Sequence, residues 1–512
     1  MAGSKKKVSG ESGEIGFVRA AKGFLIRLDG LPSVKINDVI VAESGALAYV
    51  SSILPSFVEA FVLGGQTVSV GEAFRPTGRS LGLAVGDFLL GRVVGPMGEV
   101  LDGLGKMDAA GAKEFPLEKL AVGVAYREFI TRPLLTGITV VDTLFPLGMG
   151  QRELVIGDPR SGKSSFLMEV ILNQAKSGVI CVYGAIGRPV TFVRGFMDLI
   201  LGSGETAKNT VMVASFSTDS APLVSLTPKA AMAVGEYFSG MGKDVLVVLD
   251  DMGTHAKAYR EMALLSERFP GREAYPGDIF HEQAAILERA GNFNDQGGGG
   301  SITALPVIEL PTDDFVNYIP TNLMGMTDGH LLFNTSLRAQ GRRPAIDVSL
   351  SVSRVGAQTQ NQTQNRLGIK VKETLARADE LSTLVGFGGE LPPSTQLVIN
   401  QGSLLREFFS QPGGVSLSVA EQIILLSLPF IRYLGDKDRT FVGRNKAILL
   451  QAFREDPELV KFSQEVTKLA FGDVQAGLEK ISGRIKEWVE KRSGVDREKV
   501  EVVDRETWLP DI

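Results

Sequence analysis

Apolar residues near the start of the chain come in short runs separated by turn residues. Between Gly16 and about Gly78 these runs occupy residues 24–28, 38–41, 47–50, 58–62 and 67–70. Short runs of this kind, bounded by turn residues, are typical of the strands of a small all-β fold. We therefore predict an N-terminal tail and a small β-barrel over residues 1–78.

The central part of the chain, from about residue 79 to 361, has a different pattern. Short β-branched runs alternate with longer helical stretches: the run 154–156 precedes the helical residues 164–175, and the runs 179–183 and 245–249 follow. This alternation is typical of a mostly parallel sheet whose strands are joined by helices. The pattern predicts an α/β domain over residues 79–361, so the whole chain is a multi-domain α/β protein.

The last part of the chain loses the β-branched runs. Apolar residues recur there at helical spacing, and a similar pattern returns over residues 458–492; the first set is Leu367, Val371, Leu375, Ala378, Leu381 and Val385. Such spacing predicts a helical domain over residues 362–512. The glycine-rich segment 386–389, followed by Pro392 and Pro393, predicts an exposed loop that ends the first of these helices.

Composition and charge exclude several classes of protein. The chain has 512 residues with 54 Lys and Arg against 59 Asp and Glu, a net charge of -5, so no basic excess suggests a nucleic-acid partner. Cys181 is the only cysteine and lies in an apolar run, which predicts a buried strand residue. The most apolar stretch, residues 423–431, is about half the ~20 residues that a membrane-spanning helix needs. Any membrane association is therefore expected through partners.

The strongest chemical signal is a phosphate-binding motif. Residues 157–164 fit the pattern G-x-x-x-x-G-K-[ST] and stand between a predicted strand and a predicted helix. In such a loop the backbone N–H groups face inward and the helix N-terminus adds its positive dipole end. Lys163 is expected to reach the β- and γ-phosphates, and the Ser164 hydroxyl to ligate Mg²⁺. We assign ATP or ADP binding to Gly157, Asp158, Pro159, Arg160, Ser161, Gly162, Lys163, Ser164 and Ser165.

A P-loop also needs an acidic residue at the end of a neighbouring strand to complete the Mg²⁺ shell. The apolar run 245–249 is followed directly by Asp250 and Asp251. We assign Asp250 to the metal shell together with Ser164. Asp251 is expected to orient its neighbours or to cap the following helix.

Further motifs extend along most of the chain. They stand at residues 150–154, 270–278, 301–306, 318–322, 327–329, 343–345 and 351–356. Together with the P-loop they resemble the alpha subunits of the F-type ATP synthase. The resemblance implies an N-terminal β-barrel, a central RecA-like P-loop NTPase domain and a C-terminal helical domain. It also implies a ring of three alpha and three beta subunits around a central-stalk gamma subunit, with nucleotide at every interface.

The resemblance implies a regulatory, largely non-catalytic subunit. In that family alpha subunits bind Mg-ATP, while beta subunits carry the catalytic sites and a water-activating glutamate in a Gly-Glu-Arg motif. This chain has Ile186, Gly187 and Arg188 at the corresponding place. Because an arginine cannot accept a proton from water at physiological pH, we expect the chain alone to hydrolyse ATP only very slowly. Arg188 itself is expected to be a solvated loop residue.

The resemblance also implies roles outside the P-loop. Arg354 would cross into the catalytic site of a beta subunit as an arginine finger and stabilise charge on the γ-phosphate during ATP synthesis or hydrolysis coupled to ion transport. Arg343 and Pro344 would border the adenine, and Gln411 would lie near the base. The residues after Gln411, Pro412-Gly413-Gly414, depart from the family's Gln-x-Gln pattern.

The implied partners are the beta and gamma subunits and the peripheral-stalk delta subunit. Family members carry a longer helical extension for the stalk, whereas barrel-like sequence starts here by about Gly13, so the contact with delta is expected to be reduced or different. The basic residues Lys5 to Lys7 precede no apolar run, which argues against a secretory signal. We expect a peripheral location on the cytoplasmic face of a bacterial plasma membrane.

Two other functions are considered. A self-sufficient hexameric RecA-like motor, either a secretion-type ATPase or a Rho-like translocase, must carry the catalytic glutamate and the finger on one chain, and Arg188 argues against it. A translocase would also show aromatic and basic RNA-binding signals in its N-terminal domain. An F-like ATPase that is uncoupled from ion transport shares every motif and remains an alternative.

Overall fold

The structure is a computed structural model that describes residues 13–202, 204–310, 317–385 and 392–493. The predicted basic tail and the predicted glycine-rich loop fall on residues 1–12 and 386–391, outside the described residues. The chain forms two compact units. The first comprises the described parts of Met1–Glu128, Gly178–Glu309 and Asp314–Thr327, and the second those of Phe129–Ser177, Leu310–Asp313 and Asp328–Ile512.

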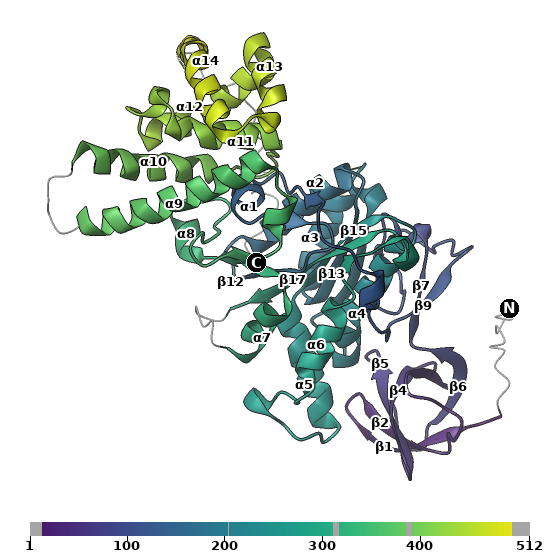
Figure 1. The fold of residues 1–512 in the computed structure, drawn as a ribbon. Helices are drawn as coiled ribbons and strands as arrows, with labels where there is room; N and C mark the ends of the chain where they lie inside the picture. Colours follow the sequence, from purple (N-terminus) through teal and green to yellow (C-terminus); the bar gives the residue numbers. More distant parts are fainter. Residues whose placement is uncertain (1–12, 203, 311–316, 386–391, 494–512) are drawn as a thin grey trace. The chain divides into compact units, whose positions relative to one another are not determined.

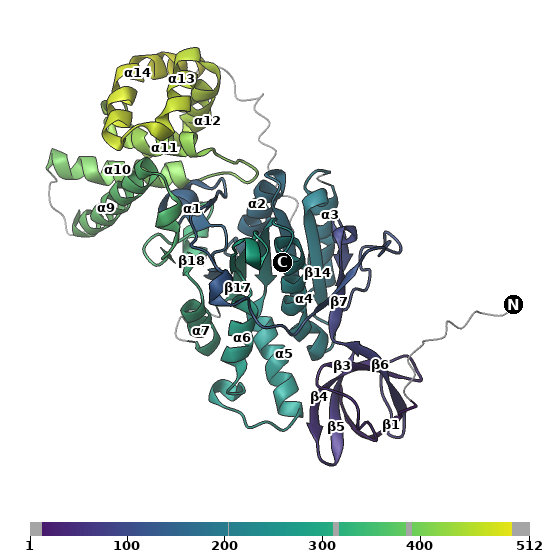
Figure 2. The same ribbon diagram turned by 45° about the vertical axis from the view of Figure 1, so that its right-hand side comes forward.

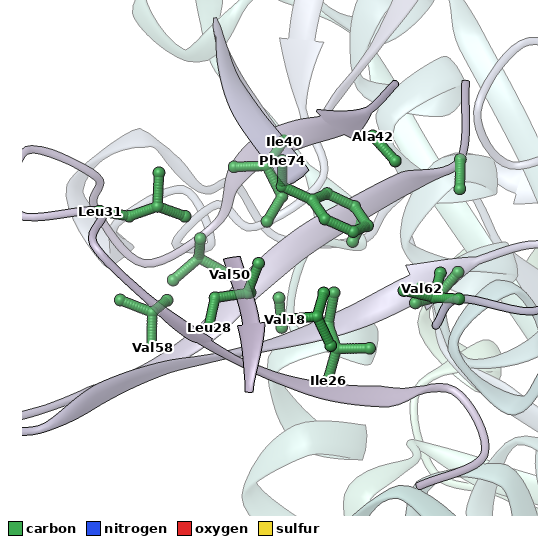
Figure 3. Close-up of a cluster of buried hydrophobic side chains, with 14 of the residues drawn as sticks. Val18, Ile26, Leu28, Leu31, Ile40, Ala42, Val50, Val58, Val62 and Phe74 are labelled. Atoms are coloured by element: carbon green, nitrogen blue, oxygen red, sulfur yellow. The ribbon is translucent and has the colours of Figure 1, made fainter. Parts of the chain in front are cut away.

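The first unit begins with a closed barrel, drawn in purple in Figure 1. Its strands follow the order β1-β2-β5-β4-β3-β6, with every neighbouring pair antiparallel. Their bounds are β1 (Gly16–Lys22), β2 (Leu25–Asp29), β3 (Asp38–Ala42), β4 (Leu47–Leu54), β5 (Phe57–Leu63) and β6 (Ala73–Ser80). Ile26, Leu28, Ile40 and Phe74 point into a shared core and are completely buried (Figure 3). The predicted barrel is confirmed.

The strand that closes the barrel differs from the prediction. The apolar run 67–70 forms no strand, and β6 pairs with both β1 and β3 instead. The sequence of β6 is mostly polar and carries Pro76 and Gly78, and Phe74 is its one completely buried large apolar side chain. A strand with so few alternating apolar residues cannot be recognised from the sequence pattern. Its position is determined instead by its pairing with the neighbouring strands.

The rest of the first unit contains a parallel sheet in the order β17-β15-β13-β14-β8. The strands are β8 (Val93–Val94), β13 (Ile180–Arg188), β14 (Thr210–Phe216), β15 (Asp244–Asp250) and β17 (Ser301–Glu309). Helix α4 (Ala221–Ser239) packs closely on β13, β14 and β15, and a Cβ on its Gly235 would lie 2.9 Å from Val247. Cys181 in β13 is completely buried, as predicted. The almost continuous apolar runs of β13 and β15 are those of buried parallel strands.

Other elements complete the first unit. They are β7 (Gly82–Val85), β9 (Lys113–Pro116), α3 (Val190–Leu201), α5 (Met252–Leu265), α6 (Ile279–Leu287), β16 (Gly291–Asn292) and α7 (Tyr318–Met326). Strands β7 and β9 form a separate antiparallel pair, and β16 pairs with β17.

The second unit is built around a pair of parallel strands. Strand β12 (Glu153–Gly157) pairs with β18 (Gly329–Phe333), and β18 pairs in turn with the antiparallel edge strand β19 (Val352–Ser353). Around them lie β10 (Pro133–Leu134), α1 (Thr139–Leu144), β11 (Leu147–Gly148), α2 (Lys163–Lys176) and α8 (Thr335–Ala339). Strand β12 is buried along its whole length.

The end of the second unit is helical, which confirms the prediction for this region. Its helices are α9 (Gln362–Val385), α10 (Pro393–Phe409), α11 (Val419–Ser427), α12 (Arg439–Glu455), α13 (Pro457–Glu465) and α14 (Phe471–Arg492). Helices α9 and α10 lie side by side in Figures 1 and 2 and are in close contact. Ser418 and Glu421 form a capping box that starts α11. None of the helices in the described ranges combines the length and the apolarity that crossing a membrane requires.

The barrel core supports a test of stability. Replacing the completely buried Phe74 by alanine removes a ring that the surrounding strands cannot replace, so we expect a loss of about 3–5 kcal/mol in unfolding free energy. The matched control is Phe17→Ala, because this ring in β1 is 54% exposed, and we expect a change within about 0.5 kcal/mol. Urea denaturation followed by circular dichroism measures both; equal effects would contradict the barrel core described here.

Candidate functional site

The loop between β12 and α2 is shaped by two glycines. Gly157 has φ +153°, and a Cβ at this position would lie 2.1 Å from the carbonyl oxygen of Phe333 in β18. Gly162 has φ +99° and directly precedes α2. The N-cap residue of α2 is Gly162 itself, so no N-cap side chain accepts a hydrogen bond from the first turn of the helix. Such a helix N-terminus is a binding site for anions.

Lys163 lies inside this loop. Its Nζ donates to the carbonyl oxygens of Gly157 at 2.9 Å and of Asp158 at 2.6 Å, and the side chain is almost completely buried. The Ser161 hydroxyl donates to the same Asp158 oxygen at 2.7 Å. The loop therefore folds around the positive charge of its own lysine. Ser164 in the first turn of α2 is partly buried, and the exposed members of the loop are Pro159, Arg160 and Ser165.

Helix α8 supports the loop from the side. The Thr335 hydroxyl donates to Oδ2 of Asp158 at 2.9 Å, and Nη1 of Arg338 donates to the carbonyl oxygen of Arg160 at 2.9 Å. These two residues were not predicted from the sequence. The sequence did contain a signal for helix α8. Asn334 directly follows an apolar run, and asparagine is a preferred residue at the start of a helix. In the structure its side chain caps α8 by accepting a hydrogen bond from the N–H of Ser336.

The residues assigned to the adenine side meet in the second unit. The backbone N–H of Gln411 donates to the carbonyl oxygen of Arg343 at 2.6 Å, which brings Arg343, Pro344 and Gln411 together. Oε1 of Gln411 accepts from the N–H and the hydroxyl of Thr139, at 3.1 and 2.9 Å. Its Nε2 donates to the carbonyl oxygens of Gly137 and Val415. All four hydrogen-bonding positions of the carboxamide are filled, so a direct bond to a base requires one of them to be given up.

Arg354 stands just after the edge strand β19. Its N–H donates to the carbonyl oxygen of Asp328 at 2.9 Å, and the carboxylate of Asp328 is bonded to the guanidinium of Arg152 at 2.8 and 3.2 Å. The residue is exposed, and within the described part of the chain its side chain forms no ion pair. The backbone of Arg354 is thus fixed, while the residue as a whole is exposed to solvent.

Asp250 ends β15 in the first unit and is completely buried. Its Oδ2 accepts a hydrogen bond from the Tyr183 hydroxyl, and its Oδ1 accepts one from Nη2 of Arg188. Burial has the largest single effect on the pKa of the Arg188 guanidinium and lowers it, but the charge and hydrogen bond of Asp250, with the nearby Tyr183 and Asp251, together raise it, and the pKa of Arg188 lies above its ordinary value. The guanidinium of Arg188 therefore stays charged, and it forms an ion pair with Asp250.

The prediction of a solvated Arg188 is wrong. Arg188 is the last residue of β13 and pairs with Phe216 of β14, and its side chain is only 18% exposed. The sheet brings the ends of β13 and β15 to the same edge, where the guanidinium meets Asp250. The following residue, Asp251, caps α5 by accepting from the N–H of Gly253 at 2.8 Å, so its predicted capping role is confirmed.

Comparison with known proteins agrees with these features. Residues 137–353 match the model of the ATP synthase alpha/beta family, nucleotide-binding domain, and residues 360–481 match that of the ATP synthase alpha/beta chain, C terminal domain. The chain is 38% identical to the ATP synthase subunit alpha of Caldanaerobacter subterraneus subsp. tengcongensis over 463 residues, which is 90% of this chain and 91% of that protein. The chain belongs to the ATP synthase alpha/beta family. It is also 37% identical to the ATP synthase subunit alpha of Mycoplasmoides gallisepticum, over 90% of this chain and 88% of that protein.

Two motifs that carried the resemblance to this family now have structural roles. Residues 150–154 lead into β12 and residues 327–329 lead into β18, and the two strands pair with Glu153 opposite Gly329. This register places Arg152 next to Asp328. This ion pair could have been predicted from the sequence, because Arg152 and Asp328 carry opposite charges and each directly precedes one of two neighbouring strands.

Glu153 of the same ATP synthase family motif is a buried acid. Its Oε2 accepts from Nε2 of Gln151 at 2.8 Å, whereas its Oε1 has no hydrogen-bond partner among the described residues. A Cβ on Gly329 would lie 2.6 Å from this carboxyl group, so the space around it is full. Burial raises the pKa of Glu153 well above its ordinary value, although the bond from Gln151 opposes the shift.

This raised pKa predicts a pH-dependent stability. An acid whose pKa is higher in the folded protein contributes stability below its unfolded pKa, about 4.3, and loses that contribution as the pH rises through the folded pKa. The side chain of Glu153→Gln cannot ionise. As the pH rises from about 5 to about 8, the melting temperature of this variant should therefore increase relative to that of the parent protein. Differential scanning calorimetry measures this, with the exposed Glu373→Gln as control. A difference that does not vary with pH would contradict the buried acid.

Proposed function

We propose that the chain acts as the nucleotide-binding, largely non-catalytic alpha subunit of an F-type ATP synthase head. The relatives named ATP synthase subunit alpha support this assignment over most of the chain. The observation that carries the non-catalytic role is Arg188, which holds Asp250 in a buried ion pair at the strand edge. A guanidinium cannot act as the general base that ATP hydrolysis needs. The same residue argues against a self-sufficient hexameric motor.

In this proposal residues 157–165 hold the phosphates of ATP or ADP. The inward N–H groups, the start of α2 and the Lys163 ammonium supply the positive field that the phosphates require. Arg343 and Pro344 border the adenine. Gln411 contributes by holding their backbone in place, because its own carboxamide is fully bonded within the chain.

Mg²⁺ fits this site only in part. The Ser164 hydroxyl stands in the first turn of α2 and is an oxygen of the kind that Mg²⁺ accepts beside phosphate oxygens. Asp250 does not fit, because both of its oxygens already accept bonds from Tyr183 and Arg188. We therefore propose Ser164 as the protein ligand of a nucleotide-bound Mg²⁺.

The proposed partners are beta subunits in an alternating ring of three plus three, the central-stalk gamma subunit and the peripheral-stalk delta subunit. Arg354 is proposed to enter the catalytic site of a neighbouring beta subunit, which its exposure to solvent and its anchored backbone support. The complex places the chain on the cytoplasmic face of a bacterial plasma membrane, with membrane contact only through partners and no nucleic-acid partner.

Nucleotide binding at the loop is tested with Lys163→Gln. The variant removes the buried charge around which the loop folds and which we assign to the phosphates, so we expect ATP affinity to fall about 10- to 100-fold. Isothermal titration calorimetry with the purified full chain gives the dissociation constant. The matched control is Lys176→Gln at the exposed end of α2, which should bind ATP like the parent protein. Equal affinities for the two variants would exclude the loop as the binding site.

The role of Arg354 is tested by reconstitution with the cognate beta and gamma subunits. We expect the lone chain to be nearly inactive, the mixture to hydrolyse ATP, and Arg354→Ala to reduce its turnover by about 10³-fold or more without loss of assembly. Arg366→Ala, an exposed arginine in α9, is the control and should keep full turnover. An ordinary hydrolysis rate of the lone chain would instead favour the hexameric motor.

A further inference from the structure

Lys446 of α12 lies at the C-terminal end of α10, within the second unit. Its Nζ donates to the carbonyl oxygen of Phe408, and to that of Ser410 at 2.8 Å. These two oxygens belong to the last turn of α10 and to the residue that caps it. The last carbonyl groups of a helix have no partner within the helix and carry partial negative charge, so an ammonium suits both of them. Lys446 therefore holds the end of α10 in place.

The segment that follows Ser410 forms the adenine side of the candidate site. Gln411 comes next in the chain, and its N–H donates to the carbonyl oxygen of Arg343 at 2.6 Å. The segment is also packed closely against α2, because a Cβ on Gly413 would lie 3.2 Å from Oε1 of Glu169. With so little space around it, the segment transmits a displacement of Ser410 to Gln411 and to the backbone of Arg343.

The charge of Lys446 depends on two surroundings, the helices that enclose it and one carboxylate. Burial lowers the pKa of the Lys446 ammonium to about 8, and the negative charge of Glu407 in α10 opposes this shift. Glu407 also accepts a hydrogen bond from Nε of Arg439 at 2.6 Å. Other charged groups on the helices around α12 pair with one another: Glu421 of α11 with Arg454 of α12, and Asp456 before α13 with Arg484 of α14.

We infer that Lys446 is a positioning residue of the nucleotide site, which holds the adenine side through the end of α10 and makes ATP affinity depend on pH. The inference rests on the proposed binding of ATP or ADP, with Arg343 and Pro344 at the adenine, and deepens it. Lys446 acts on the base only through Gln411 and Arg343. When the ammonium loses its proton it keeps one donor fewer and no charge, so it holds the two carbonyl groups more weakly.

The first test is isothermal titration calorimetry of the purified full chain at about pH 7. Lys446→Met removes the charge and the donors, so we expect the dissociation constant of ATP to rise about 3- to 10-fold. Inorganic tripolyphosphate has no base and addresses the loop 157–165 alone, so its binding should not change. Lys461→Met, at an exposed position on α13, is the control and should leave both constants at the parent values. An equal loss for ATP and tripolyphosphate would overturn the inference.

The pH profile separates positioning by a charged group from a merely structural side chain. In the parent protein the dissociation constant of ATP should rise about threefold between about pH 7 and pH 9, because the ammonium loses its proton near pH 8. Lys446→Met should show no such rise. Lys446→Arg stays charged over this range, so it should keep the parent affinity at all of these pH values. A parent profile as flat as that of Lys446→Met would contradict the inference.

Glu407→Gln keeps the inference testable should Lys446→Met fail to fold, which circular dichroism shows. The variant leaves Lys446 in place and removes the carboxylate that favours its charged form, so the midpoint of the pH profile should move to lower pH. Glu455→Gln, at the exposed end of α12, is the control and should keep the parent midpoint. A midpoint that Glu407→Gln leaves unmoved would overturn the inference.

The outcomes distinguish this inference from the proposed function on which it rests. If the parent chain bound no ATP at any of these pH values, the proposed nucleotide site would fail and this inference with it. If the parent chain bound ATP and folded Lys446→Met bound it equally well, the inference alone would fail and the nucleotide site would stand.

Discussion

The pairing of β12 with β18 is the interaction on which the candidate site depends. At one end of the pair, Gly157 passes so close to the Phe333 carbonyl that no side chain fits between them, and the loop is shaped there. At the other end, Arg152 and Asp328 form the ion pair beside which the backbone of Arg354 is anchored. The register of this one parallel strand pair therefore determines both the shape of the 157–165 loop and the backbone position of the exposed Arg354.

Local signals were enough to predict most of the fold and the position of the glycine-rich loop between β12 and α2. Glycine and lysine spacing identified the loop, because backbone conformation and phosphate contact impose that spacing directly on the sequence. The C-terminal helices were identified by their periodicity, because a helix that packs on one face needs apolar residues at helical spacing. The closing strand β6 was not predictable in this way, because its polar residues follow the barrel only through pairing with β1 and β3.

The contacts of Arg188 and Gln411 could not be predicted from the sequence, because their partners are distant along the chain. Arg188 meets Asp250 across 62 positions, and Gln411 meets Thr139 across 272. Residue type alone predicts a solvated side chain for an arginine, whereas in the folded chain the Arg188 guanidinium and the Gln411 carboxamide both bond to other groups of the chain. Buried polar groups must find partners, and which partner they find is a property of topology rather than of local pattern.

The buried position of Cys181 has a practical consequence for labelling chemistry. The chain has one cysteine, it is completely enclosed in β13, and burial raises the pKa of its thiol, so little reactive thiolate is available. Maleimide and similar probes should therefore leave the native chain unmodified. A cysteine introduced at an exposed position would be the sole reactive thiol, and fluorophores or spin labels could be attached there without first removing the native residue.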